Sequence, residues 1–316
     1  MANTKEIQDR INSIRDTMKI TRAMYMMSSM KLRKAKQKLA NTEPYFFSLQ
    51  EQIRDILYHY PDMQHLYFDN RNKDLAESVK RKGFVVVTGD KGMAGAYNLN
   101  VLKQARELID EAEDYRLFVV GELGRQFFKS RGYVIEEDFA YSANNPSIHR
   151  ARMMAERMMK LYKDEELDEI YIVYTKMINS MSEEAQVQRL LPLQTHKFIE
   201  QEMLEKIQNE QGEYDLQAAE KLHDEWYLIY PSPKAVLEKV VDNYITGFFY
   251  GALVEASASE ENARMMAMQS ATDNAEAMLH DLSIEYNRVR QAAITQEITE
   301  VIGGAKALKK KKKQAR

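Results

Sequence analysis

The chain has 316 residues, enough for one large domain or two small ones, and its 44% hydrophobic and 29% charged residues are ordinary for a globular protein. No apolar run reaches the roughly 18 residues of a transmembrane helix, and the polar start "MANTKEIQDR" lacks the apolar region of a secretory signal. The chain contains no cysteine, which excludes disulfides, thiolate metal sites and cysteine nucleophiles and fits a reducing compartment.

The net charge of −3 is unevenly distributed along the chain. Residues 1–40 hold ten Lys and Arg against three acidic residues, and residues 305–316 hold seven against none. The middle of the chain is therefore strongly acidic. If the two ends lie together, they form one strongly positive element.

The first predicted element is a long helix that starts near residue 7 and continues toward residue 57. Neither Gly nor Pro occurs between residues 7 and 39. Apolar or small residues recur there in alternating steps of four and three, which is a heptad seam: Ile7, Ile11, Ile14, Met18, Thr21, Tyr25, Ser28, Leu32, Ala35 and Leu39. Such a helix needs a partner along its length.

The middle of the chain predicts a small parallel α/β sheet. Short apolar runs occur at 83–90, 115–123 and 168–178, followed by 185–193, with helical patterns at 98–113, 123–131 and 147–162 between them. A late strand is expected at 226–230. Residues 200–225 carry nine acidic residues and two lysines and are expected to form a solvated insertion.

A second long helix is predicted from residue 234 to about 302. Ser232 can cap its N-terminus, Pro233 takes the first helical position, and Gly303-Gly304 is expected to end it. A heptad pattern recurs here too: Ala275, Leu279, Leu282, Tyr286, Val289 and Ala293. We expect the two terminal helices to pair as an antiparallel coiled coil. The expected divisions are 1–58, 59–82 (a polar connection), 83–230, 231–304 and a basic tail, 305–316.

The loop "TGDKGMAGAYN" (88–98) follows a strand and precedes a helix, as phosphate-binding loops do. It matches neither common glycine-rich phosphate motif, so a structural turn is the default interpretation. The six histidines are scattered without metal-binding spacing, and no catalytic motif stands out. We therefore expect no catalytic, cofactor or metal site.

The stretch "ITRAMYMMSSMKLRKAKQ" (20–37) combines methionines on several sides of a helix with many basic residues. A helix that is apolar on all sides favours a surrounding protein over a flat membrane, and methionine packs against changing neighbours. We therefore expect this segment to bind in a cavity formed by surrounding protein.

Several stretches resemble the γ subunit of F-type ATP synthase, in the same order along the chain. The N-terminal helix "MKITRAMYMMSSMKLRKAK" (18–36) does so, as do "ARMMAMQSATDNAEAM" (263–278) and "YNRVRQAAITQEITEVIGGA" (286–305). In the middle, "TGDKGMAGAYNLNVL", "YIVYTKMINSMSEEAQVQRLLPL" and "YPSPKAVL" agree as well.

The resemblance implies a rotor shaft without a catalytic site of its own. In that family the terminal helices form an antiparallel coiled coil inside a ring of three α and three β subunits, and a Rossmann-like α/β domain lies against ε and the c-ring. Proton or sodium flow turns the ring and the shaft, and nucleotide chemistry belongs to the β subunits. This implies peripheral attachment, through the complex, to the cytoplasmic face of a bacterial plasma membrane.

The resemblance also implies which residues contact the surrounding ring. Along the rotor–stator surface these are Arg22, Met24, Lys31, Arg33, Arg264, Gln291, Thr295 and Glu297. Ile298, Val301 and Ile302 correspond to the tip held in an apolar bearing. The alternative for each is a solvated or seam position on a coiled coil. Lys91 and Ala96 stand where the family usually has Arg and Gly. The lysine-rich tail continues past the usual C-terminus of the family, and we expect it to be a disordered extension.

Three other interpretations stay open from the sequence. The basic ends could clamp nucleic acid, although the rotor interpretation expects no nucleic-acid partner. The central domain could be a nucleotide-binding enzyme. The chain could also be the shaft of a related ATPase attached to other machinery.

Overall fold

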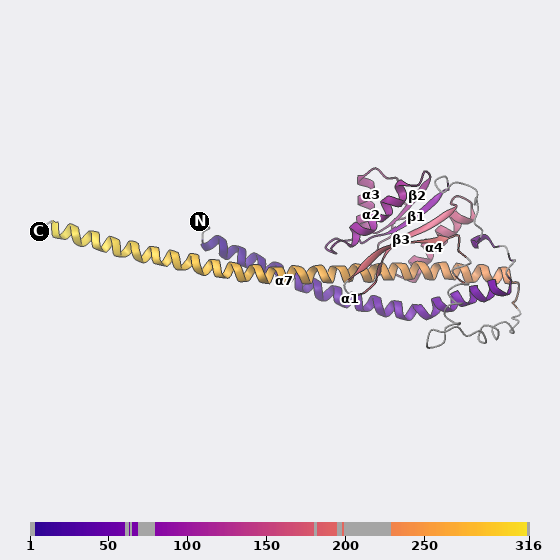
Figure 1. Cartoon of the computed structure of the whole chain (residues 1–316), viewed down its shortest axis with the longest axis horizontal. Helices are drawn as coiled ribbons and strands as arrows, with labels where there is room; N and C mark the ends of the chain where they lie inside the picture. Colours follow the sequence, from indigo (N-terminus) through magenta and orange to yellow (C-terminus); the bar gives the residue numbers. More distant parts are fainter. Residues whose placement is uncertain are drawn as a thin grey trace, which may run out of the picture. The chain divides into compact units, whose positions relative to one another are not determined.

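The computed structural model describes residues 4–60, 63, 65–68, 80–179, 182–194, 198 and 229–314. It contains two compact units, which we call the head unit, Ser28–Arg264, and the paired-helix unit, Met1–Met27 with Met265–Arg316 (Figure 1). The predicted insertion at 200–225, and residues 226–228 of the predicted late strand, lie outside the described residues.

A four-stranded sheet forms the centre of the head unit, in the order β2-β1-β3-β4. The strands are β1 (Lys82–Val87), β2 (Tyr115–Val120), β3 (Glu169–Met177) and β4 (Glu183–Leu191). β1 runs parallel to both β2 and β3, as predicted, but β4 is antiparallel to β3. The reason is that only five residues separate the end of β3 at Met177 from the start of β4 at Glu183, whereas a parallel connection needs a crossover of a dozen residues or more.

Helices cover both faces of the sheet because side chains alternate along each strand. Phe84 and Val86 point to the face covered by α2 (Tyr97–Asp110) and α3 (Glu122–Ser130). Val85 and Val87 point to the opposite face, in a larger core shared with α4 (Ile148–Lys163), the short 3-10 helix η1 (Leu66–Phe68) and the two long helices. The result is a three-layer α/β/α arrangement.

The two long helices are α1 (Thr4–His59) and α7 (Pro233–Gln314). Within the head unit they run antiparallel, because Lys31 pairs with Glu261 while Phe46 stacks on Tyr244 with ring centroids 4.9 Å apart. Residues from both helices enter the core of the larger face, including Ile53 and Val241, which are fully buried.

The paired-helix unit contains the first part of α1 and the last part of α7. All ten predicted seam positions of α1, which extend into the head unit, are buried or half-buried, and most positions between them are exposed. The six predicted seam positions of α7 behave in the same way. Near the middle of the seam, the hydroxyls of Thr21 and Thr272 are 2.8 Å apart and buried. The heptad prediction is therefore confirmed at residue level.

The predicted start of α7 is confirmed and its predicted end is wrong. Ser232 Oγ accepts a hydrogen bond from the N–H of Ala235 at 3.3 Å, and Pro233 is the first helical residue. The helix does not stop at Gly303-Gly304 but continues to Gln314. Two glycines cost a helix only about 1 kcal/mol each, and the lysines that follow favour a helical C-terminus through the helix dipole.

Candidate functional site

The outer face of α1 places several of the predicted contact residues in solvent. Arg22 and Arg33 are exposed, and Met24 is half-buried. The Arg22 guanidinium pairs with Glu276 of α7, and both side chains are about half exposed. Ile20, Met26 and Met30 are each more than 60% exposed on the same helix. The solvent-exposed surface of α1 therefore combines large apolar side chains with basic ones on more than one side of the helix.

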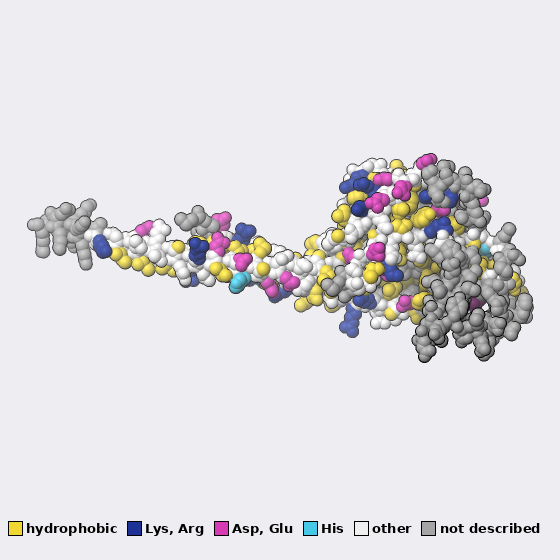
Figure 2. Space-filling view, in the orientation of Figure 1, with side chains coloured by type: hydrophobic (Ala, Val, Ile, Leu, Met, Phe, Trp, Pro, Cys, Tyr) yellow, Lys and Arg dark blue, Asp and Glu magenta, His cyan; other side chains and the backbone are white. Residues whose placement is uncertain are grey.

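Beyond Ala293, every α7 residue from Ile294 to Lys306 is exposed. Gln291, Thr295 and Glu297 lie at exposed positions, and the Thr295 hydroxyl donates to the Gln291 carbonyl at 2.8 Å. Apolar side chains continue along this segment (Figure 2), with exposed fractions of 54% for Ile298, 71% for Val301 and 51% for Ile302. Ile294, Ile298, Val301 and Ile302 are spaced by four, three and one residues, so their exposed side chains form one apolar stripe along the helix.

Arg264, in contrast, is only 7% exposed and is held inside the head unit. Its guanidinium pairs with Glu260, lies 3.1 Å from Glu261 Oε1, and donates to the carbonyls of Lys91 and Gly92. Lys31 Nζ also contacts Glu261 Oε1, at 2.8 Å. We call Lys31, Glu260, Glu261 and Arg264 the charge cluster. It ties α1, α7 and the loop after β1 together.

Burial and charge set the protonation of the charge cluster. Burial raises the pKa of Glu260, and this is only partly offset by the Arg264 guanidinium. Burial would also raise the pKa of Glu261, but hydrogen bonds from Lys31 and Ser28 and the Arg264 charge together lower it. The two neighbouring carboxylates therefore differ, with Glu261 the more firmly ionised.

The loop between β1 and α2 is built as a structural turn. The Asp90 carboxylate accepts hydrogen bonds from the Glu122 N–H at the start of α3, and from Ser142 and Asn144. Asp90 thus occupies the N-terminus of α3, and at the start of α2 the Asn98 side chain accepts a hydrogen bond from the Gly89 N–H at 2.8 Å. A Cβ added to Gly89 would lie 2.8 Å from Glu260 Oε1, which gives this glycine a packing role.

Glu260 and Glu261 were not predicted from the sequence as the partners of Arg264. The spacing could have predicted both ion pairs, because residues three and four positions apart lie on one side of a helix. These ion pairs were not predicted because consecutive polar and charged residues on a long helix usually face solvent. Burial under the loop after β1 places these glutamates in an internal charge cluster.

No group of three or more His, Asp and Glu side chains among the described residues is arranged to hold a metal ion. None of the described helices combines the length and apolarity needed to span a membrane.

Comparison with known proteins places the chain in one family over nearly its whole length. Residues 3–308 match the family described as ATP synthase. The chain is 41% identical to the ATP synthase gamma chain of Ruminiclostridium cellulolyticum, covering 97% of this chain and 99% of that protein. It is 42% identical to the same protein of Caldanaerobacter subterraneus subsp. tengcongensis, with 95% and 98% covered. It is 37% identical to the sodium ion specific ATP synthase gamma chain of Acetobacterium woodii, with 97% and 99% covered.

Solved structures agree on the fold. The central stalk and c-ring structure of the Tetrahymena thermophila mitochondrial ATP synthase contains a chain with a TM-score of 0.55 and 20% identity, covering 80% of this chain and 99% of that one. A chain of the Euglena gracilis mitochondrial ATP synthase has a TM-score of 0.53 and 17% identity, with 90% and 95% covered. The paired terminal helices, the mixed sheet between them and the full-length sequence matches agree: this chain belongs to the family of ATP synthase gamma chains.

Proposed function

We propose that this chain is the rotor shaft of an F-type ATP synthase, transmitting torque between an ion-driven c-ring and a catalytic ring of three α and three β subunits. The observation that carries the proposal is the paired-helix unit. Its seam stabilises a stiff helix pair, and α7 then continues past Ala293 with its apolar side chains exposed. A coiled coil supplies stiffness, and the exposed part supplies a surface for a bearing.

The exposed residues define how the shaft would act on the ring. Arg22, Lys31 and Arg33 would meet acidic surfaces of the β subunits through screenable, long-range attraction. Gln291, Thr295 and Glu297 would form polar contacts with the β subunits, and Ile298, Val301 and Ile302 would turn in an apolar bearing. Met24 would adapt to successive β conformations, because methionine is flexible and polarisable.

In this proposal the subunit is not itself catalytic. Nucleotide binding and phosphoryl transfer take place in the β subunits, and the shaft changes their conformation as it turns. The head unit contacts the ε subunit and the c-ring. The protein is peripheral to the cytoplasmic face of the plasma membrane and binds no nucleic acid.

Arg264 has a different place in the proposal from the other contact residues. Its burial and four internal partners support a role in fixing the loop after β1 to α7. Any effect on the β subunits would pass through that loop. The loop carries Met93, which is 61% exposed and has a positive φ of 64°.

Subunit composition is the first test. Native mass spectrometry of the complex isolated through this chain should find one copy with three α and three β subunits, together with ε and a c-ring. Recovery of the chain alone or with nucleic acid would overturn the proposal, and the second result would favour a nucleic-acid clamp.

Cross-linking tests the contact surface, and because this chain contains no cysteine, an introduced cysteine is its single thiol. In the assembled complex, Ile298→Cys carrying a photoactivated cross-linker should join α or β subunits and stop ATP hydrolysis. The matched control is Val134→Cys, at an 80% exposed position of the head unit. It should join rotor subunits and leave hydrolysis intact. Inhibition by the control but not by Ile298→Cys would contradict the proposed arrangement.

A further inference from the structure

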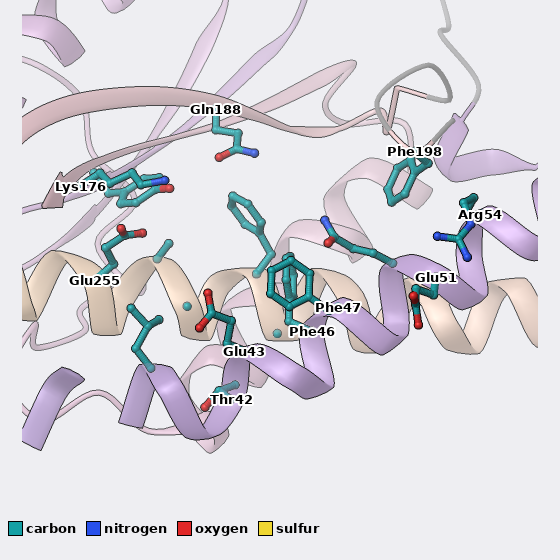
Figure 3. A pocket seen from close by; sticks show the side chains of 17 residues that line it. Thr42, Glu43, Phe46, Phe47, Glu51, Arg54, Lys176, Gln188, Phe198 and Glu255 are labelled. Carbon is teal, nitrogen blue, oxygen red and sulfur yellow. The ribbon is translucent and has the colours of Figure 1, made fainter. Parts of the chain in front are cut away.

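A cavity of about 750 Å³ lies within the head unit, between α1, α7 and the strands β3 and β4 (Figure 3). This volume falls in the range of sites that hold small organic ligands. The rotor function proposed above makes no use of it.

Two glycines on α7 open the cavity. Gly247 and Gly251 are four residues apart, which places them on the same side of the helix, and both line the cavity. A Cβ at Gly251 would meet nothing within 4 Å, whereas one at Gly247 would touch Phe46 Cδ2 at 3.4 Å. Glycine inside a helix is less stable than alanine. At Gly251 the chain therefore keeps an unfavourable residue where a larger one would fit.

The walls of the cavity are aromatic along much of its length. Phe46 stacks on Tyr244 at 4.9 Å and lies tilted against Phe248 at 6.3 Å between ring centroids. Phe47, which also lines the cavity, is 55% exposed. These rings offer faces to an apolar or cationic group.

Charged side chains line the cavity along its length. Figure 3 shows Glu255 of α7 beside Lys176 of β3 near one end, Glu43 of α1 beside Phe46 and Phe47, and Glu51 and Arg54 of α1 toward the end that holds Phe198. Burial raises the pKa of Glu255, the Lys176 charge opposes this shift, and the Glu43 charge adds to it. The Lys176 charge acts more strongly on Glu255 than the Glu43 charge does. The lining as a whole carries three carboxylates (Glu43, Glu51 and Glu255) against two basic side chains (Lys176 and Arg54), so its formal charge is negative.

We propose that this cavity binds an organic cation with an apolar body, holding its ammonium group between Glu43 and Glu255 and its apolar part against Phe46 and Phe248. A cation balances the excess negative charge of the lining and gains a nearby aromatic face. An anion of the same shape would face two carboxylates, and burial of unpaired like charges is costly.

Titration of the full-length chain with a matched pair of probes tests the proposal. 4-Phenylbutylamine is cationic at pH 7, and 4-phenylbutanoate has a similar shape with the opposite charge. In ligand-observed NMR, the amine should bind at least about tenfold more tightly than the carboxylate. Equal binding of the two probes, or no binding of the amine, would overturn the proposal.

Variants separate the roles of space and charge. Gly251→Leu should weaken binding of the amine, because the new side chain would project into the cavity beside Phe46 and Phe248. Glu255→Gln should weaken binding about tenfold, whereas Lys176→Gln should strengthen it several-fold, because the competing ammonium is gone. The control Glu113→Gln makes the same charge change in the loop after α2 and should leave binding unaltered.

The opposite signs expected for Glu255→Gln and Lys176→Gln keep the test decisive even if Gly251→Leu fails to fold. Parallel changes in those two variants, or unaltered binding in a folded Gly251→Leu chain, would show that the amine binds elsewhere.

Discussion

Arg264 balances two buried carboxylates in the head unit, so its removal should be costly. Glu260 and Glu261 are 6% and 5% exposed and would lose their shared guanidinium. Replacing one partner of a buried ion pair typically costs about 3–5 kcal/mol. We expect Arg264→Met to lower the free energy of unfolding by that amount, measured by denaturant titration of the full chain.

Arg22 offers a matched control for this prediction. It also pairs with a glutamate, Glu276, but both side chains are about half exposed. Exposed ion pairs contribute about 0–1 kcal/mol, so Arg22→Met should change stability by no more than that. Similar losses in the two variants would mean that the charge cluster is not the buried network described here.

Glu183 should make the head unit less stable as the pH rises. Burial raises the pKa of this carboxyl to about 7 from its ordinary value of 4.5, and its Oε2 is buried with no hydrogen-bond partner among the described residues. Between pH 4.5 and 7 the folded chain therefore binds more protons at this site than the unfolded chain, and stability falls across that window.

Glu183→Gln should remove this dependence. At pH 8 we expect the variant to be about 1–2 kcal/mol more stable than the native chain, less than the full shift implies because solvent screens a partly exposed group. At pH 4.5 or below the gain should vanish. Denaturant titrations at both pH values check this, and equal gains at the two values would contradict the assigned pKa.

At the scale of elements, the heptad seam should carry the stability of the paired-helix unit. Ile11 is 5% exposed in the seam, whereas Ile20 is 61% exposed on the same helix. Truncating a buried isoleucine to alanine costs about 2–5 kcal/mol, and we expect the lower part of that range in a two-helix core. Ile20→Ala should cost less than about 0.5 kcal/mol.

Amide hydrogen exchange along residues 4–27 measures this difference directly. Ile11→Ala should lose protection throughout the segment, and Ile20→Ala should keep it. Loss of protection in both variants would mean that the outer face of α1 also stabilises the helix pair.

The terminal helices could be predicted from sequence because their pattern repeats over many turns. The seam positions from Ile7 to Leu39 follow one heptad period, and all of them are buried or half-buried. The end of α7 was mispredicted because a glycine pair is a local signal that favourable residues on both sides can override. The direction of β4 was also missed, although the short connection after Met177 already favoured an antiparallel hairpin.

The site was harder to predict than the fold. Exposure of Thr295, Glu297 and Ile298 agrees with a contact surface, but their contacts with other subunits stay predictions. Arg264 reads from sequence as one more surface arginine on a long helix. Its burial depends on the loop after β1, which is more than 170 residues away in the chain, and local spacing does not encode that contact.

At the scale of the whole molecule, positive charge is concentrated at the two ends of the chain. Residues 1–40 and 305–316 are strongly basic, while the sequence as a whole has a net charge of −3. Separated charge of this kind acts mainly on association rates, because attraction extends over about 10 Å at 0.1 M salt. The basic tail should therefore speed entry of the shaft into an acidic ring rather than hold it there.

Replacing Lys309 to Lys313 with glutamine tests this role. At low ionic strength we expect association with isolated α and β subunits to slow about tenfold. The difference should disappear near 1 M salt, where the screening length falls to about 3 Å. Arginine at the same five positions should preserve the native rate, because charge rather than residue identity matters. A rate defect that persists at high salt would instead indicate a specific contact made by the helical end of α7.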